Sequence, residues 1–210
     1  FMFKGSARRA FLTTMLAVTS LLVATGARPA TADAGSPVGT LAGGVHFSQE
    51  CGGPGIGVGI TYDGANLWYS CYNSSPDLLR ADPRTGQVTA AYNVDGGLGA
   101  LAYDASRNAI WAGWGGPNRG DIRLIMLDSS QSVSSSSVAF NTCKSSTCSD
   151  DIDDGLSYDG GNDALYFSPD TSQTIYHYST QGALLTDGPS GNGAIPWAGG
   201  GACYNSGLAI

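Results

Sequence analysis

Beyond residue 32 the chain shows no amphipathic helical period, and one strand-like pattern occurs three times. In each copy a five-residue run of small and apolar residues ends in Tyr-Asp, a polar turn follows, and a second run is aromatic and aliphatic. Such runs joined by Gly, Asn, Asp and Ser predict β-hairpins. The first runs are residues 59–63, 100–104 and 155–159, and the second runs are residues 67–70, 110–113 and 165–168.

Further strands are predicted after each hairpin. The serine-rich stretch that begins at Gln131 alternates toward Val138 and Phe140, which is typical of a polar outer strand. A fourth copy of the pattern opens at residues 207–210. Third strands are expected at residues 78–81, 122–127 and 175–178, and fourth strands at residues 88–92 and 183–185.

Four antiparallel strands per repeat of about 40 to 55 residues are typical of a β-propeller blade. We therefore predict an all-β fold, a β-propeller of four-stranded antiparallel blades, with about three blades and the first strand of a fourth present. The strands that contain Tyr62, Tyr103 and Tyr158 should lie innermost and side by side. The alternative is a β-sandwich of short strands, which does not require a repeating Tyr-Asp hairpin. Because a propeller closes with about four to eight blades and Phe1 precedes Met2, we expect the sequence to be part of a longer protein.

Residues 1–32 have the features of a cleavable export signal. Lys4 and the pair Arg8-Arg9 form a basic segment, and an apolar run and a small-x-small motif follow. We expect cleavage before Asp33. The paired arginines also resemble the twin-arginine motif, so both the general secretory route and the twin-arginine route stay open. An uncleaved membrane anchor is the alternative interpretation.

The predicted domain organisation follows from this signal. Residues 33–44 are rich in Gly, Ala, Pro and Ser and are expected to be a flexible linker, and residues 45–210 are expected to form the partial propeller. The expected location is secreted or extracellular. No stretch after the signal approaches about 18 apolar residues, so no membrane span is predicted once the signal is cleaved.

The net charge of the mature chain restricts the classes of partner that it can bind. The signal carries four basic residues and no acidic ones, so its removal lowers the net charge from −7 to −11. Such a field repels phosphate backbones and anionic lipids, and it favours divalent cations. We therefore expect a small molecule, a carbohydrate or a protein at the cell surface as the partner, and no nucleic acid.

Five cysteines follow the signal, and in an oxidising compartment they predict disulfides. Cys51 and Cys71 flank the first hairpin and form one expected pair. Cys143 can pair with Cys148 across a short loop; alternatively, Cys148 pairs with Cys203. Because the count is odd, either one thiol is free or its partner lies on another piece of chain. The absence of a CxxC pair argues against a zinc site.

Ligands of propellers bind at the mouth of the central channel, beside the loops that lead into the innermost strands. In this chain polar groups precede the third and fourth of these strands, and an acidic residue precedes the first. Carboxylate and amide oxygens suit calcium or another divalent cation, and no other cofactor is expected. The alternative is a solvated acidic turn. The candidate metal ligands are Asp154, Asp153, Asn205 and Glu50, whereas Asp163 is expected in a solvent-facing hairpin turn.

Aromatic side chains supply a second kind of candidate site. Trp68 and Trp111 recur at one position of the repeat and are expected in the core. Trp114 and Trp197 are expected in loops, where they could stack on a sugar. His177 is expected to be an ordinary strand residue. The chain has no Gly-x-Ser-x-Gly motif and no strand-to-helix phosphate loop, so it lacks the signals of an α/β-hydrolase or a nucleotide site.

Residues 154–159 and 205–210 resemble the starts of the inner strands in gluconolactonase/regucalcin-like (SMP-30-type) propellers. NHL-like and streptogramin-lyase-like propellers have similar patterns. The resemblance implies that Asp154 binds a divalent metal and that Glu50 is near a second ligand position. It also implies an Asn where this chain has Ser206. The activity it implies is hydrolysis of a lactone or ester, in which the cation polarises a carbonyl and activates water.

Two functions remain open at this point. The first is a ligand-binding or scaffold propeller without a specific activity, and the second is a metal-dependent lactone or ester hydrolase. The first is favoured because only Asp154 clearly fills a ligand position of the lactonase type.

Overall fold

The computed structural model describes residues 50–51, 56–72, 74–94, 97–114, 120–143, 153–169, 174–185 and 194–196. The chain divides into two units, residues 1–42 and 43–210, and all the described residues belong to the second. Several predicted features lie outside the described residues: the signal peptide, the linker, the fourth copy at residues 207–210, Cys148, Cys203, Asn205 and Trp197.

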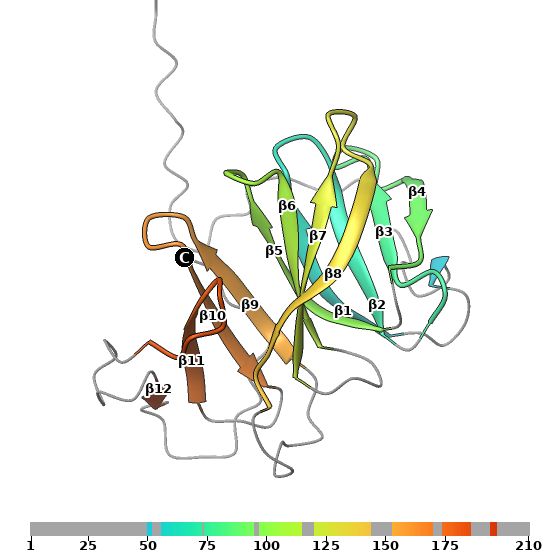
Figure 1. Cartoon of the computed structure of the whole chain (residues 1–210). Coiled ribbons are helices and arrows are strands. Elements are labelled where there is room, and N and C mark those ends of the chain that lie inside the picture. Colours follow the sequence, from blue (N-terminus) through green and yellow to red (C-terminus); the bar gives the residue numbers. More distant parts are fainter. Residues whose placement is uncertain are drawn as a thin grey trace, which may run out of the picture. The chain divides into compact units, whose positions relative to one another are not determined.

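Within the described residues, twelve β-strands form three separate four-stranded antiparallel sheets, which are blades of a β-propeller (Figure 1). Each sheet takes its strands in chain order. Blade 1 consists of β1 (Ile56–Tyr62), β2 (Leu67–Tyr72), β3 (Leu78–Ala81) and β4 (Val88–Tyr92). Blade 2 consists of β5 (Leu98–Asp104), β6 (Ala109–Trp114), β7 (Asp121–Leu127) and β8 (Val133–Asn141). Blade 3 consists of β9 (Asp153–Asp159), β10 (Ala164–Pro169), β11 (Thr174–Ser179) and β12 (Ala194–Pro196).

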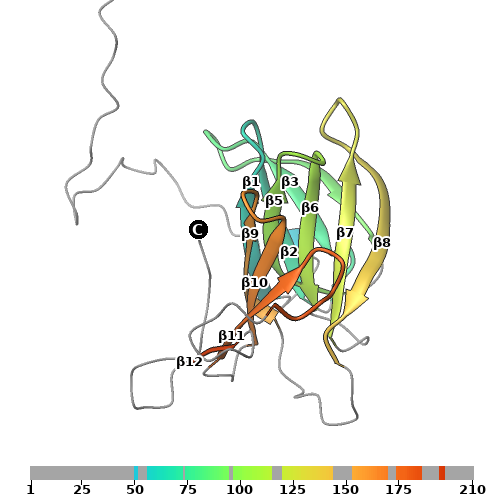
Figure 2. The same cartoon turned by 60° about the vertical axis from the view of Figure 1, so that its left-hand side comes forward.

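The first strands of the three blades lie next to one another (Figure 2), and β5 contacts both β1 and β9. Tyr103 of β5 donates its backbone N–H to Thr61 Oγ1 of β1 at 3.1 Å. This arrangement confirms the predicted inner strands and excludes the two-sheet sandwich. Among the described residues there is no helix with the length and apolar character needed to cross a membrane.

The fourth strand of blade 3 was predicted at residues 183–185, and that prediction is wrong. Leu184 forms only an isolated bridge with Tyr178. The ladder on β11 is instead made by β12, which pairs with Thr174, Ile175 and Tyr176. Two short segments therefore share the outer edge of β11. Residues 183–185 follow a tight turn at Gly182, whose φ is +82°, and contact only the last part of β11.

Two apolar clusters fill the spaces between the blades. β5 serves both, because successive side chains of a strand point to opposite faces. Each fully buried large apolar side chain contributes about 1.5–3 kcal/mol. The cluster between blades 1 and 2 contains Trp68, Leu78, Leu98, Leu101, Ile110 and Ile125. The cluster between blades 2 and 3 contains Ala100, Ala102, Trp111, Ile122, Leu156, Leu165 and Phe167. Trp68 and Trp111 are thus core residues, as predicted.

Candidate functional site

The Asp of the repeated Tyr-Asp pair closes the hairpin turn of each blade. Asp63 Oδ1 accepts hydrogen bonds from the backbone N–H groups of Ala65 and Asn66, at 2.7 and 2.6 Å. Asp104 and Asp159 accept the equivalent pairs of bonds in their own turns. Asp is well suited to this role, because its short carboxylate reaches the backbone two residues onward. The recurring carboxylates are therefore structural.

A tryptophan on the second strand binds the same carboxylate in blades 1 and 2. Trp68 Nε1 donates to Asp63 Oδ2 at 2.7 Å, and Trp111 Nε1 donates to Asp104 Oδ2 at 3.2 Å. Burial raises the pKa of both carboxyls. The hydrogen bonds outweigh this effect and hold each pKa below its ordinary value: Trp68 contributes most for Asp63, and Ser106 contributes most for Asp104.

The Tyr of the pair holds the last residue of the turn in blades 2 and 3, whereas Tyr62 of blade 1 donates its hydroxyl to the carbonyl of Gly64 at 2.6 Å. Tyr103 donates its hydroxyl to Asn108 Oδ1 at 2.9 Å, and Tyr158 donates to Asp163 Oδ1 at 3.1 Å. Asn108 and Asp163 have φ values of 50° and 51°, in the left-handed region. Asn and Asp tolerate this conformation better than other non-glycine residues. The whole Tyr-Asp signature is thus explained by the hairpin turns.

Arg107 joins the turns of blades 2 and 3. Its Nη1 lies 2.6 Å from Asp104 Oδ2 and 2.7 Å from Asp163 Oδ1, and its Nη2 donates to Asp163 Oδ2 at 2.7 Å. Nη1 also donates to the Tyr158 hydroxyl at 3.0 Å. The Asp104 side chain is fully buried, whereas that of Asp163 is 44% exposed. This clamp links two blades through charge-assisted hydrogen bonds.

Asp163 lies in a hairpin turn and is partly exposed, as predicted, and the clamp adds an ion pair that the prediction did not include. Arg107 holds the pKa of Asp163 well below its ordinary value, chiefly by its hydrogen bonds to the carboxylate. Asp163 and then Asp104 raise the pKa of the Arg107 guanidinium. One signal in the sequence could have pointed to this pair. The turns between the first and second strands of the three blades consist of small, polar or acidic residues, except for Arg107.

The opposite end of the inner strands carries the predicted metal ligands. Asp153 and Asp154 are the first two residues of β9 rather than part of a loop. Asp154 is partly buried and has an interaction partner, and Glu50 is exposed beside Cys51. Within the described part of the chain, no group of three His, Cys, Asp or Glu residues could hold a metal ion. Asn205 lies outside that part, so the full predicted set is not brought together by the described residues.

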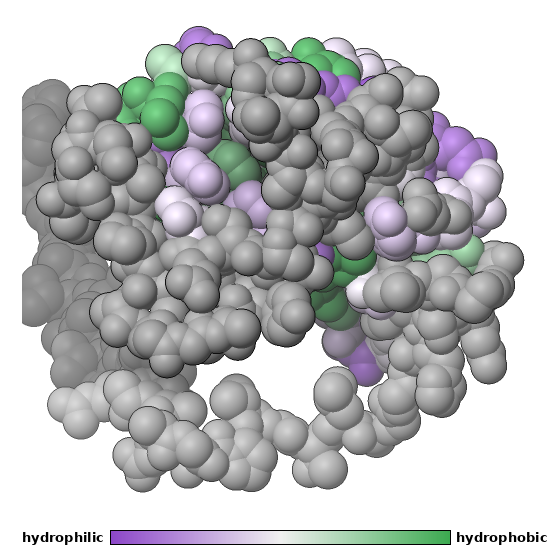
Figure 3. All heavy atoms as spheres, turned by 90° about the horizontal axis from the view of Figure 1, so that it is seen from below, coloured by the Kyte–Doolittle hydropathy of each residue, from purple (hydrophilic) through white to green (hydrophobic). Residues whose placement is uncertain are grey.

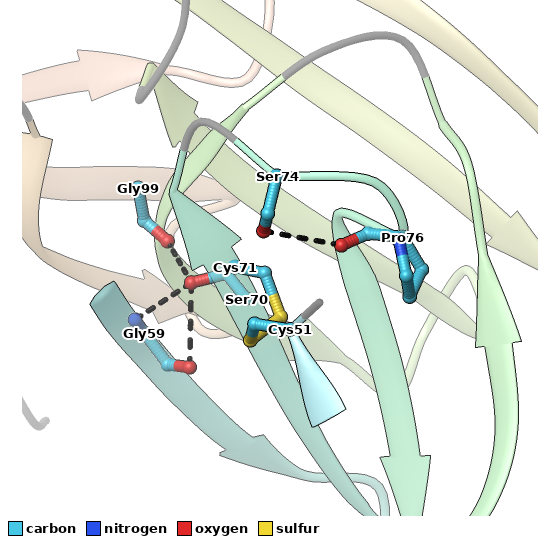
Figure 4. Close-up of a disulfide and its surroundings, with 7 residues drawn as sticks. All are labelled: Cys51, Gly59, Ser70, Cys71, Ser74, Pro76 and Gly99. Carbon is cyan, nitrogen blue, oxygen red and sulfur yellow. Dashed lines mark hydrogen bonds between the residues drawn. A yellow bond between two sulfur atoms is a disulfide. The ribbon is translucent and has the colours of Figure 1, made fainter. Parts of the chain in front are cut away.

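A buried serine joins blades 1 and 2 at this same end (Figure 4). Ser70 Oγ accepts the backbone N–H of Gly59 at 2.7 Å and donates to the carbonyl of Gly99 in β5 at 2.6 Å. A Cβ on Gly59 would lie 2.6 Å from the backbone nitrogen of Leu101, so only glycine permits this approach. Ser70 and Gly59 form a neutral pin between the two blades.

The predicted disulfide between Cys51 and Cys71 is confirmed, with a Cα–Cα distance of 5.6 Å (Figure 4). It packs with Leu79 in a small third cluster on the face of blade 1 that points away from blade 2. Cys143 is also disulfide-bonded, and its partner lies outside the described residues. The predicted pair Cys143–Cys148, with Cys148–Cys203 as its alternative, therefore stays a prediction.

Of the two candidate stacking residues, Trp114 lies in a strand and Trp197 lies outside the described residues. Trp114 was expected in a loop, but it is the last residue of β6 and is opposite Leu98 in the ladder. Ladder pairing with β5 extends the strand by one residue beyond the local pattern. His177 is a buried residue of β11, as predicted, and stacks on Tyr166 with ring centroids 4.0 Å apart.

The described surface has few exposed large apolar side chains. Ile60 and Tyr62, both on β1, are 55% and 51% exposed. Seen from below, apolar and hydrophilic residues are interspersed over the coloured part of the surface (Figure 3). Ile60 and Tyr62 occupy the repeat positions of Leu156 and Tyr158, which pack on the preceding blade.

The chain resembles known proteins in structure alone. No family model and no curated protein matches the chain. Among solved structures, a luciferin-regenerating enzyme is 17% identical with a TM-score of 0.50, and the match covers 70% of this chain and 47% of that one. A nidogen/laminin complex matches at 18% identity and TM-score 0.49, over 74% and 53% of the two chains. The β-propeller domain of Cps50 (Swd1) from Myceliophteria thermophila matches at 12% and 0.49, over 74% and 47%. The chain spans about half the length of these structures.

Proposed function

We propose that this chain is part of a secreted β-propeller with a ligand-binding or scaffold role and no catalytic activity of its own. The observation that carries the proposal is the use of the repeated polar residues. Asp63, Asp104 and Asp159 each close a turn, and Arg107 and Ser70 join blades. These groups are committed to a rigid frame rather than to chemistry on a substrate.

The disulfide supports a location outside the cytoplasm, because such bonds persist in oxidising compartments. The exposed pair Ile60 and Tyr62 does not by itself indicate a partner, because Leu156 and Tyr158 occupy the same repeat positions and pack on the preceding blade. A small-molecule ligand would occupy the mouth of the channel, near the start of β9.

Binding and catalysis are separated by one set of experiments on the purified exported protein. Immobilised cell-surface polysaccharides and surface-protein extracts should retain the chain in a saturable way. A panel of sugar lactones and aryl esters should not be hydrolysed above background, with or without added calcium. Lactone hydrolysis that disappears in Asp154→Asn would contradict the proposal and establish the hydrolase.

The hydrolase is kept as a second candidate because of the position of Asp154. This residue is partly buried and directly precedes Gly155 near the start of inner strand β9, where the SMP-30-type resemblance requires a metal ligand. Asp153, Asn205 and Glu50 would supply further oxygens to calcium or a similar cation.

Calcium binding is tested by thermal unfolding. A ligand that binds only the native state raises the melting temperature, so calcium should raise it and a chelator should lower it. Asp154→Asn should abolish this response. Asp121→Asn is the matched control, because Asp121 lies on β7, away from the inner strands, and its carboxylate accepts a hydrogen bond from Asn141. A melting temperature that ignores both calcium and chelator would remove this candidate.

Export is tested directly at the N-terminus. Cleavage before Asp33 should leave a mature chain that begins with Asp-Ala-Gly. Replacing Arg8 and Arg9 by lysines should block export if the twin-arginine route is used and should leave it intact if the general secretory route is used.

A further inference from the structure

The face of blade 3 that points away from blade 2 repeats the surface with which blade 1 holds β5. Leu156 and Tyr158 of β9 pack toward blade 2, so strand alternation places Gly155 and Ser157 on the opposite face, called here the outer face of blade 3. We propose that this outer face receives residues 206–210 of the chain as the inner strand of a fourth blade, in the register in which blade 1 receives β5.

The strand ladders show that the two faces correspond position by position. Thr61 is opposite Trp68 in blade 1, and Ser157 is opposite Tyr166 in blade 3. On the third strands, Arg80 is opposite Trp68, and His177 is opposite Tyr166. A hydroxyl on the first strand, an aromatic ring on the second and a basic side chain on the third therefore recur on both faces. Thr61 uses its hydroxyl to accept an amide of β5, and Ser157 offers the same group.

The serine pin recurs as well. Ser70 bridges the Gly59 amide to the Gly99 carbonyl of the next blade. Ser168, which is opposite Gly155, occupies the corresponding position in blade 3 and is fully buried. Among the described residues, its Oγ has no hydrogen-bond partner. Buried hydroxyls are normally bonded, so this position requires an acceptor on the outer face.

Residues 206–210 carry the sequence that fits this face. Aligning the repeats places Gly207 at the position of Ala100, so the Ser206 carbonyl takes the place of the Gly99 carbonyl. Leu208 then takes the place of Leu101, which packs into the apolar cluster with blade 1. In this register Leu208 would face blade 3, and Ala209 would face away from it.

Glycine at position 155 permits the close approach that the register requires. At Gly59 the neighbouring strand comes so near that a Cβ would meet its backbone within 2.7 Å. Ser168 and His177 are 0% and 3% exposed, although blade 2 packs on the other face of the sheet. Their burial fits an outer face that is covered.

A double-mutant cycle on the full-length chain tests the assignment. Ser168→Ala removes the donor to Ser206, and Leu208→Asp places a carboxylate against blade 3. Ser168→Ala alone should lower the melting temperature by about 2–4 °C. In the Leu208→Asp background it should have no further effect, because the docked strand is already lost.

Two controls make the cycle specific. Ser70→Ala should lower the melting temperature equally in both backgrounds, since its partner is β5. Ala209→Asp should leave the Ser168→Ala effect intact. The proposal is overturned if Ser168→Ala has the same effect with and without Leu208→Asp. It is also overturned if that effect depends on protein concentration, which would assign the outer face to a second copy of the chain.

Discussion

The junction between blades 1 and 2 and the junction between blades 2 and 3 are built differently on the same repeat. The first is held by a neutral pin, in which Ser70 bridges two backbones and Gly59 allows close contact. The second has no serine at the equivalent position of β6, where the residue is Gly113. Its polar link is the ionic clamp of Arg107 with Asp163 at the opposite end of the strands.

The difference teaches that a repeat can keep its apolar packing while it changes the polar contacts that set the register between blades. A neutral buried pin tolerates changes of pH and salt. An exposed ion pair is weakened by both, because screening and protonation act on charges. We therefore expect the two junctions to respond differently to mutation and to acid.

The largest effect is expected from Gly59→Val. The added side chain would overlap the backbone of Gly99, Ala100 and Leu101, which are part of a strand and cannot move aside cheaply. The free energy of unfolding should fall by about 3 kcal/mol or more, as measured by urea unfolding. Gly64→Val is the control, because a Cβ there meets nothing within 4 Å, although the φ of +96° adds its own smaller strain.

Arg107→Met should weaken the junction between blades 2 and 3. It leaves the buried Asp104 carboxylate without its guanidinium, although Ser106 and Trp111 still donate to it. The loss should be about 2–3 kcal/mol, the cost of removing hydrogen bonds to charged groups. Hydrogen exchange should show the loss in β9 and β10 before it reaches β1. Equal loosening of all three blades would contradict a local clamp.

Ser70→Ala should cost about 1–2 kcal/mol, because it leaves the Gly99 carbonyl and the Gly59 amide without a partner in a buried site. The measurement is again urea unfolding, now at several pH values. The cost should be the same at pH 7 and pH 4, since no ionisable group takes part in the pin. A cost that changes with pH would show that the pin is coupled to a titrating residue.

The smallest effect is expected from acid at the clamp. The pKa of Asp163 is lower in the folded protein than its ordinary value of about 3.9. Its contribution is therefore complete above that value and is lost as the pH falls below about 4 toward the folded pKa. Because Asp163 is 44% exposed, screening keeps the contribution to about 1 kcal/mol or less. Asp163→Asn should flatten the dependence of stability on pH between 5 and 3, whereas Ser70→Ala should leave that slope unchanged.

Local patterns in the sequence sufficed for the hairpins and for the disulfide of the first blade. The Tyr-Asp runs, the polar turns and the aromatic second strands depend on contacts within about ten residues. The serine-rich stretch from 131 was correctly expected to be an outer strand, because its alternation matches a strand with one exposed face. Cys51 and Cys71 were paired correctly because they flank one hairpin.

The errors and omissions arose where a segment distant in the sequence pairs with a strand edge or with a charged side chain. Leu184 was assigned to a strand that β12 forms instead, and Trp114 was placed in a loop although Leu98 extends its ladder. Asp163 lies in the predicted hairpin turn, but its ion pair with Arg107 of the neighbouring blade was not predicted. Each case concerns a partner more than about ten residues away, which local periodicity does not encode.

The sequence by itself determined the hairpins, the propeller class and the glycine and serine positions that recur between blades. These features follow from strand alternation and from turn chemistry, which act along the chain. Only the tertiary structure decided that the repeated Asp residues close turns, that Arg107 links two blades and that Ser70 pins β5. Those roles depend on which blade lies beside which, and the buried side chains acquire them only when the inner strands meet.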